Sequence, residues 1–283
     1  MLPLKTADHV LNGARYRVRK AGAGANIVLM LHGWPDDGQL WQHQAGVLAD
    51  AGYCAICPDL LGYGESDAPH ELARCSVPAM AADMLALIDQ LNADAVHLVG
   101  HDYGAMIAWE MALAAPERFA SFSALSVGHP APLTEIRIEN LRYHWYLALA
   151  NTSIGADLYL ASKGCLMREL LRSHPEGAMM TQRCLDDPER LHNMRRIELS
   201  MPVADLLLDR LSRQHPYAPK CQVPTLGLWG EADDLVPERQ MIETGRYVAT
   251  DWRYSLIAGG GHWMMLSDPG AVTRALLDWI QAR

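Results

Sequence analysis

The sequence is poor in positive charge and lacks any long apolar segment. Its 283 residues carry 24 Lys and Arg against 33 Asp and Glu, which gives a net charge of −9. An acidic chain without a basic cluster argues against nucleic acid and against an anionic membrane surface as partners. Because no run of about 18 apolar residues is present, we predict no membrane span.

A secretory signal and metal-binding motifs are also missing. Residues 1–20 contain no apolar stretch typical of a signal peptide, so the six cysteines indicate reduced thiols and a cytoplasmic protein. Cys54 and Cys57 form a C-x-x-C within a predicted strand, whereas the redox motif needs a helix N-terminus. We interpret them as core thiols. The twelve histidines show no paired spacing such as H-E-x-x-H, so no metal and no cofactor are predicted.

Short apolar runs alternate with segments of helical spacing along most of the chain. This alternation predicts an α/β fold, with a mostly parallel sheet and helices on both faces. Strands are expected at 14–19 (at an edge or half-buried), 26–31, 52–58, 96–99, 119–127, 224–230 and 252–257. Helices are expected at 41–48, 77–91, 105–115, 237–247 and 269–281.

The alternation is interrupted after residue 130, where only helical patterns and loops follow. We therefore divide the chain into a first part of the core at 1–130, an inserted helical lid at 131–219 and a second part of the core at 220–283. An insertion that follows the carboxyl end of a strand is expected to lie over the edge where such sheets bind ligands.

The segment Gly100-His101-Asp102-Tyr103-Gly104 joins a predicted buried strand to a predicted helix. A G-x-nucleophile-x-G turn bends so tightly that its central side chain projects from the sheet edge. Asp102 is then a candidate nucleophile. The alternative is an ordinary tight turn in which Asp102 caps the helix.

Two later loops supply partners for such a nucleophile. His262 follows three glycines after the last predicted strand, and Asp233 follows the strand before it. The order nucleophile, acid, histidine is that of the nucleophile-elbow enzymes. Asp233 is the preferred acid, and Asp234 and Glu231 remain alternatives.

These motifs together resemble the α/β-hydrolases with an aspartate nucleophile, which include epoxide hydrolases and certain dehalogenases. His32-Gly33-Trp34-Pro35 is similar to their H-G-x-P motif, and His129-Pro130 to the H-P after the next strand. The resemblance implies that Asp102 attacks an sp3 carbon to form an ester on the enzyme. The backbone N–H groups of Trp34 and Tyr103 then form an oxyanion hole.

The resemblance also implies the second step, in which His262, oriented by Asp233, activates a water that hydrolyses the ester. Tyr146 matches the first lid tyrosine of epoxide hydrolases, which donates a proton to the opening ring. No tyrosine occurs within 195–213, where the second one is expected. His144 is a possible substitute, and His144-Trp145 resembles the pair that cradles fluoride in fluoroacetate dehalogenases.

We therefore predict an epoxide hydrolase that converts an apolar epoxide to a diol, with a small apolar molecule and water as its partners. Met179, Met180, Met106 and Ile107 suggest the apolar site. One alternative is a dehalogenase for a neutral haloorganic compound. The other is a non-hydrolytic protein of the same fold that binds a ligand or acts as a biosynthetic cyclase. No oligomeric state is predicted.

Overall fold

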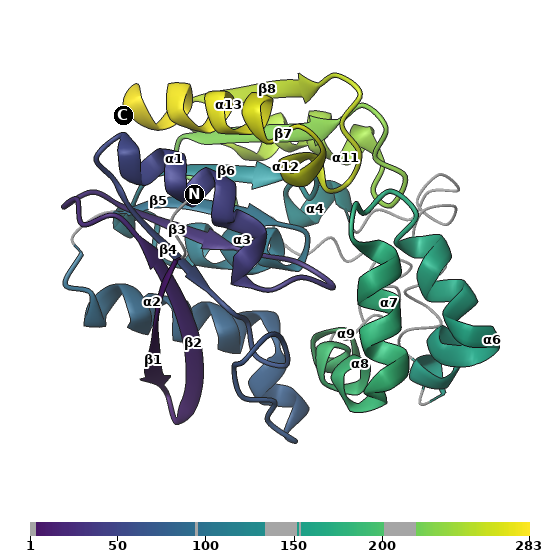
Figure 1. The fold of residues 1–283 in the computed structure, drawn as a ribbon. Helices are drawn as coiled ribbons and strands as arrows, with labels where there is room; N and C mark the ends of the chain where they lie inside the picture. The colour runs from purple at the N-terminus through teal and green to yellow at the C-terminus, as the bar shows by residue number, and fades with distance from the viewer. Residues whose placement is uncertain (1–3, 94–95, 134–151, 153, 201–218) are drawn as a thin grey trace.

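A single twisted sheet forms the centre of the molecule. The computed structural model describes residues 4–93, 96–133, 152, 154–200 and 219–283. Within them, eight strands pair in the order β1-β2-β4-β3-β5-β6-β7-β8. From β4 onward every pairing is parallel, whereas β1–β2 and β2–β4 are antiparallel. The predicted mostly parallel α/β sheet is confirmed (Figure 1).

The strands agree closely with the apolar runs of the sequence. The three strands β3, β4 and β5 are buried along their whole length, as expected for strands covered on both faces. The bounds are β1 Lys5–Leu11, β2 Ala14–Ala21, β3 Ile27–Leu31, β4 Cys54–Pro58, β5 Val96–His101, β6 Phe119–Leu125, β7 Thr225–Gly230 and β8 Trp252–Ile257. Cys54 and Cys57 are free and buried in β4.

The N-terminal strand β1 was not predicted from the sequence. Most of its side chains are exposed, so it lacks an apolar pattern. It forms a hairpin with β2 through Asn12 and Gly13, and both have positive φ, as a two-residue turn between twisted strands requires. Consequently β1 is the edge strand, and β2 is a half-buried strand between β1 and β4.

The core helices cover both faces of the sheet. The chain moves from β3 to β4 in one direction and from β4 past β3 to β5 in the other. Right-handed crossovers therefore place α1 on one face and α2 on the opposite face, and α13 packs against α1 while α3 packs against α2. Their bounds are α1 Gln42–Asp50, α2 Val77–Gln90, α3 Tyr103–Ala114, α11 Glu238–Thr244, α12 Met264–Ser267 and α13 Pro269–Gln281.

A group of helices lies between β6 and β7 in the chain. A short helix, α4 (Pro130–Leu133), follows β6 directly. The cap helices are α6 Gly155–Leu170, which is broken at 161–164, α7 Gly177–Asp186, α8 Pro188–Met194 and α9 Arg196–Ser200. Figure 1 shows them gathered to one side of the sheet, beyond the ends of the parallel strands. Among the described residues, no helix is long and apolar enough to cross a bilayer.

The reversal of strand order determines where a site can form. Because β4 and β5 lie on opposite sides of β3, the connections leaving β3 and β5 diverge to opposite faces and leave a crevice between them. Ligands of open α/β sheets bind in such crevices, at the carboxyl ends of the strands. The turns after β3 and β5 meet here, and these turns carry Trp34 and Asp102.

A substitution at Gly104 tests how tightly the turns after β3 and β5 are packed. A Cβ on Gly104 would lie closer than 3.0 Å to the carbonyl oxygens of Leu31 and His32. Because these are backbone atoms, the helix or the strand must shift to accept it. We expect Gly104→Ala to lower the free energy of unfolding, measured in urea, by about 1–3 kcal/mol.

Gly270, near the start of α13, is the matched control. A Cβ there meets the flexible end of the Arg274 side chain at 3.3 Å and, in ordinary van der Waals contact, a carboxylate oxygen of Asp268 at 3.8 Å. We expect Gly270→Ala to leave stability unchanged or to raise it slightly, since alanine restricts the unfolded chain. Equal losses in both variants would contradict the tight packing of the turns.

Candidate active site

Asp102, the candidate nucleophile, lies between β5 and α3 in a strained backbone conformation. Its φ of 52° and ψ of −120° cost about 1–3 kcal/mol for a residue with a Cβ. Its carboxylate makes no capping hydrogen bond to α3. Instead, Oδ1 accepts the Trp34 backbone N–H at 2.9 Å. The helix-cap alternative is therefore wrong, because the turn directs this carboxylate away from the helix and toward the β3 turn.

The turn after β3 approaches Asp102 closely at Gly33. A Cβ on Gly33 would lie closer than 3.0 Å to Cβ of Asp102, so only glycine fits there. His32 fixes the turn from beneath, because its Nε2 accepts the Leu60 N–H at 2.9 Å and its Nδ1 lies 2.9 Å from the Gly33 carbonyl. Burial lowers the pKa of His32, which keeps the ring neutral and able to accept.

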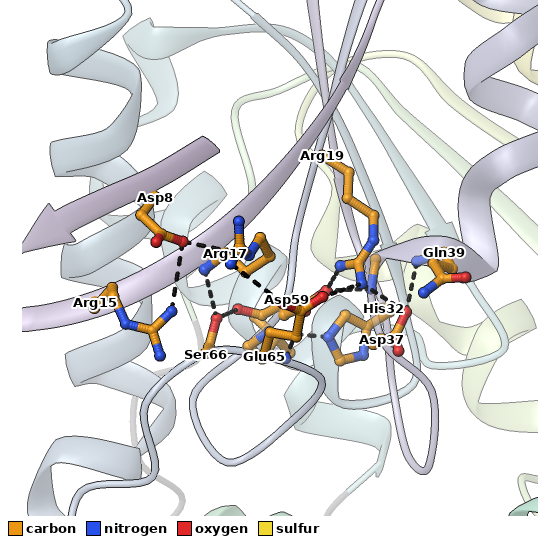
Figure 2. A network of polar contacts seen from close by, with 12 residues as sticks. Asp8, Arg15, Arg17, Arg19, His32, Asp37, Gln39, Asp59, Glu65 and Ser66 are labelled. Carbon is orange, nitrogen blue, oxygen red and sulfur yellow. Dashed lines mark hydrogen bonds and ion pairs between the residues drawn. The ribbon is translucent and has the colours of Figure 1, made fainter. Parts of the chain in front are cut away.

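A buried ion pair anchors the loops on either side of this turn. Asp59, which is fully buried, pairs with the guanidinium of Arg19 on β2. The same carboxylate accepts backbone N–H groups from Gly38 at 2.8 Å and Glu65 at 2.9 Å. Figure 2 shows these contacts converging on Asp59. The loops after β3 and β4 are thus joined to each other and to β2 through one anion.

His262 and Asp233 lie next to Asp102. The Nε2 of His262 is 3.6 Å from Oδ2 of Asp102, and its Nδ1 is 3.0 Å from Oδ2 of Asp233. Asp233 is itself held by the backbone N–H groups of Leu235 and Val236, each 3.0 Å from Oδ1. The three side chains therefore form a continuous chain, although their loops follow three different strands.

The two alternative acids point elsewhere. Asp234 pairs with Arg172 at 2.8 Å and accepts from the Ser173 hydroxyl at 3.2 Å. Glu231 accepts the backbone N–H of Gly259 at 2.9 Å. The geometry therefore favours Asp233 as the partner of His262.

Two further residues that sequence reasoning did not identify hold the His262 backbone. The carbonyl of His262 lies 3.1 Å from His101 Nε2 and 3.2 Å from the Ser126 hydroxyl. Burial lowers the pKa of His101 to about 3, so this ring stays neutral beside His262. In the sequence, only the position of His101 next to Asp102 could have indicated a role at the site. Its contact with His262 could not be predicted, because the two residues are 161 positions apart.

Burial and charge act against each other in this cluster. Burial alone lowers the pKa of His262, but the carboxylates of Asp233 and Asp102 outweigh it and raise this pKa to about 10. Burial alone raises the pKa of Asp102, but the hydrogen bond and charge of His262 outweigh it and hold this pKa below its ordinary value. The free site therefore contains an anionic Asp102 against a protonated His262.

A comparison with protein families identifies the fold family. The family described as "alpha/beta hydrolase fold" matches residues 26–269. This protein belongs to the α/β-hydrolase fold family. The match spans β3 to the start of α13 and therefore includes Asp102, Asp233 and His262.

Individual relatives of this α/β-hydrolase are named epoxide hydrolases. Epoxide hydrolase A of Mycobacterium tuberculosis is 28% identical, and the alignment covers 95% of each chain. Epoxide hydrolase 4 of Mus musculus is 28% identical over 92% of this chain and 75% of its own length. The crystal structure of an epoxide hydrolase from Vigna radiata superposes with a TM-score of 0.82 over 99% of both chains, at 22% identity. The last likeness supports the fold alone.

A small cavity lies directly beside Asp102 in this α/β-hydrolase. Its volume is about 20 Å³, which is room for about one water molecule. The apolar part of its lining comes from Trp34, Tyr159, Leu170 and Leu235. Asp102, Tyr103, Glu198 and His262 supply the polar part.

Glu198 is a buried carboxyl group on α9 that the sequence analysis did not identify. Its side chain is 3% exposed, and its Oε1 accepts the hydroxyl of Tyr103 at 3.0 Å. Burial raises the pKa of Glu198 to about 7 against the opposing effects of Tyr103 and Arg195. No motif marks this residue, because its relation to the site depends on how the cap helices fold back.

The described part of the chain leaves out the expected lid residues and places the expected apolar residues away from the Asp102 cavity. Tyr146, His144 and Trp145 fall outside the described residues. Met179 and Met180 were expected to make the substrate site apolar. This expectation is wrong, because they line a different groove of about 650 Å³. Met106 packs against the core, and Ile107 is fully buried in it. The residues that make the Asp102 cavity apolar are instead two aromatic and two leucine side chains.

One carboxylate connects the cap helices to both sides of the site. Asp36, just after the Trp34 turn, is buried and accepts from Trp263 Nε1 at 3.0 Å. Its other oxygen lies 3.2 Å from Nε2 of His174, which belongs to the loop between α6 and α7. Since Trp263 adjoins His262, Asp36 links the turn that bears Trp34, the loop that bears His262 and the cap.

The pKa of His262 provides a direct test of its electrostatic environment. In Asp102→Asn one of the two anions is removed, so we expect the pKa of His262 to fall below its value of about 10. Titration of the ring nitrogens by NMR measures this change. As a control, Asp89→Asn removes a surface carboxylate that pairs with Arg118 and should leave the His262 titration unchanged. An unaltered pKa in Asp102→Asn would show that the two groups do not interact.

Proposed function

We propose that this chain is an epoxide hydrolase that opens an apolar epoxide through an ester on Asp102 and releases a diol. The observation that carries this proposal is the asymmetry of the Asp102 carboxylate. Oδ1 accepts the Trp34 N–H at 2.9 Å, while Oδ2 faces His262 at 3.6 Å. The names of the relatives over most of the chain length support the same activity.

In the first step, Oδ2 of Asp102 attacks a ring carbon of the epoxide. The carbon–oxygen bond of the ring breaks, and an ester forms between the substrate and the enzyme. Oδ1 becomes the ester carbonyl oxygen and already has its donor in the Trp34 N–H. The Tyr103 backbone N–H is proposed as the second donor of this oxyanion hole.

In the second step, His262 takes a proton from a water that attacks Cγ of the ester. Once the ester has formed, Asp102 carries no charge, and one cause of the raised pKa of His262 is gone. The pKa of the imidazole therefore falls, and the ring more easily takes the neutral form that a base requires. Asp233 stabilises the imidazolium that forms as the water is deprotonated.

The apolar lining of the cavity favours a substrate with an apolar body. Trp34, Tyr159, Leu170 and Leu235 surround the only polar cluster of the cavity that the described residues form. Tyr146 is proposed as a proton donor to the ring oxygen, with His144 and Trp145 beside the substrate. These three assignments rest on sequence resemblance.

Accumulation of the ester in His262→Gln tests the proposal. Without the base, we expect the intact mass to increase by the mass of one whole epoxide after exposure to styrene oxide, 1,2-epoxyhexane or cyclohexene oxide. Peptide mapping should place the adduct on Asp102. The double variant Asp102→Asn/His262→Gln is the control and should gain no mass.

Other masses identify the two alternatives. A gain equal to the substrate minus HX, from a haloorganic compound only, would replace the proposal with a dehalogenase. No gain, together with tight binding of an apolar ligand and no turnover by the unaltered protein, would favour a non-hydrolytic role.

Substitutions of Asp233 and of its neighbour Asp234 can be compared to test whether Asp233 orients His262. Asp233→Asn leaves His262 without its anionic partner, so we expect hydrolysis of the preformed ester to slow by roughly 100-fold or more. Asp234→Asn alters only the contacts with Arg172 and Ser173 and should keep its rate within a few-fold. Single-turnover mass spectrometry measures both rates, and similar losses would remove Asp233 from the proposal.

A further inference from the structure

Opening an epoxide creates an alkoxide unless a proton reaches the ring oxygen as the bond breaks. Asp102 and His262 line the cavity and are assigned to the attack and to the activation of water. The groups with an acidic proton on the remaining lining are Tyr103, Tyr159 and Glu198. The protonated His262 directs its two ring N–H groups at Asp102 and Asp233. A further proton donor must therefore be one of the two tyrosines or Glu198, or must come from outside the described residues.

We propose that Glu198, as a neutral carboxylic acid, delivers this proton from Oε2 to the ring oxygen and so takes the role that sequence resemblance gave to Tyr146, an inference that rests on the proposed function. Its Oε1 is occupied as the acceptor of the Tyr103 hydroxyl at 3.0 Å. Its Oε2 is buried, and the described residues give it no hydrogen bond of good geometry, only the Arg195 guanidinium at 3.5 Å. A proton on Oε2 therefore lacks a protein acceptor there, and a bound epoxide supplies one.

The two tyrosines are less suited to this step. The hydroxyl proton of Tyr103 is already directed at Glu198. Burial raises the pKa of Tyr159 far above its ordinary value, which makes its proton harder to transfer. Tyr103 is accordingly a positioning residue that orients the Glu198 carboxyl group.

Charged and titratable groups from several elements of the fold surround Glu198. The guanidinium of Arg195 is 3.5 Å from Oε2 and favours the anion, whereas burial and the charge of Asp102 favour the acid. The other titratable groups that interact with it are Tyr103 on α3, Tyr159 on α6 and Tyr63 after β4. The balance brings the pKa of Glu198 to about 7, near the value that suits a general acid.

Ester formation itself favours the transfer. When Asp102 attacks, its negative charge is lost, and with it one reason for the raised pKa of Glu198. The carboxyl group therefore becomes a stronger acid as the ring oxygen becomes a stronger base. The coupling requires that both carboxyl groups line one cavity, as they do.

The protons balance over the cycle. In the first step the ring carbon–oxygen bond breaks, Glu198 loses its proton to that oxygen, and Asp102 becomes an ester. In the second step water adds at Cγ, the ester bond breaks, and the diol leaves with one of the water protons. Before this step His262 passes the proton that it holds in the free site to the Glu198 carboxylate, and the other water proton then returns to His262 beside the regenerated Asp102 anion.

The test follows the rate of ester formation in His262→Gln, where His262 no longer titrates. With styrene oxide, 1,2-epoxyhexane and cyclohexene oxide, we expect the rate constant to be level below about pH 6 and to fall as the pH rises through about 7. Adding Glu198→Gln keeps an acceptor for Tyr103 but removes the acid. The rate should then fall by about 10²- to 10⁴-fold and lose its dependence on pH.

Two further variants separate proton donation from a structural role. Glu198→Asp retains an acid and should retain the pH dependence at a lower rate, which also covers a failure of Glu198→Gln to fold. Glu243→Gln changes another buried glutamate, which pairs with Arg239 on α11, and should alter neither the rate nor its pH dependence.

The outcomes separate this inference from the proposed function. An epoxide adduct that forms in His262→Gln/Glu198→Gln at the parental rate, or with the parental pH dependence, overturns the role of Glu198 and leaves the proposed function intact. Absence of any epoxide adduct in His262→Gln itself overturns both.

Discussion

The close approach of two backbone turns, one after β3 and one after β5, is the constraint on which the candidate site depends. Gly33 and Gly104 permit it, because a Cβ at either position would overlap Asp102 or the carbonyl of Leu31. The approach brings the Trp34 N–H to Oδ1 of Asp102 and helps to hold a backbone conformation that is otherwise unfavourable. The fixed anion then contributes to the raised pKa values of two neighbours, together with Asp233 at His262 and in addition to burial at Glu198.

Most of the core could be predicted from the sequence, because its signals are local. Buried parallel strands appear as short apolar runs, and seven of the eight described strands were expected close to their actual bounds. The exception, β1, is mostly exposed and carries little apolar pattern. The Asn12-Gly13 turn was a usable signal for it, because two successive positive φ angles favour these residue types.

The site was predictable where its residues follow strand ends and less so elsewhere. Asp102, Asp233 and His262 could be selected from the order of the loops, and the structure brings them within hydrogen-bond or ion-pair distance of one another. Glu198 had no such signal, because it reaches the cavity through the packing of α9 against the core. The methionines were misplaced for the same reason, since an apolar sequence does not reveal which groove it lines.

Asp36 has a consequence for the exchange of segments between related proteins. This carboxylate belongs to the core, yet one of its two partners, His174, belongs to the cap. A cap transferred from a relative, by recombination or by design, leaves a buried acceptor unsatisfied unless it carries a donor where His174 stands, at a cost of about 1–3 kcal/mol. The turn that bears Trp34 would be the first part of the core to lose its support. A cap that replaces the present one must therefore include a hydrogen-bond donor to Asp36 at the position of His174.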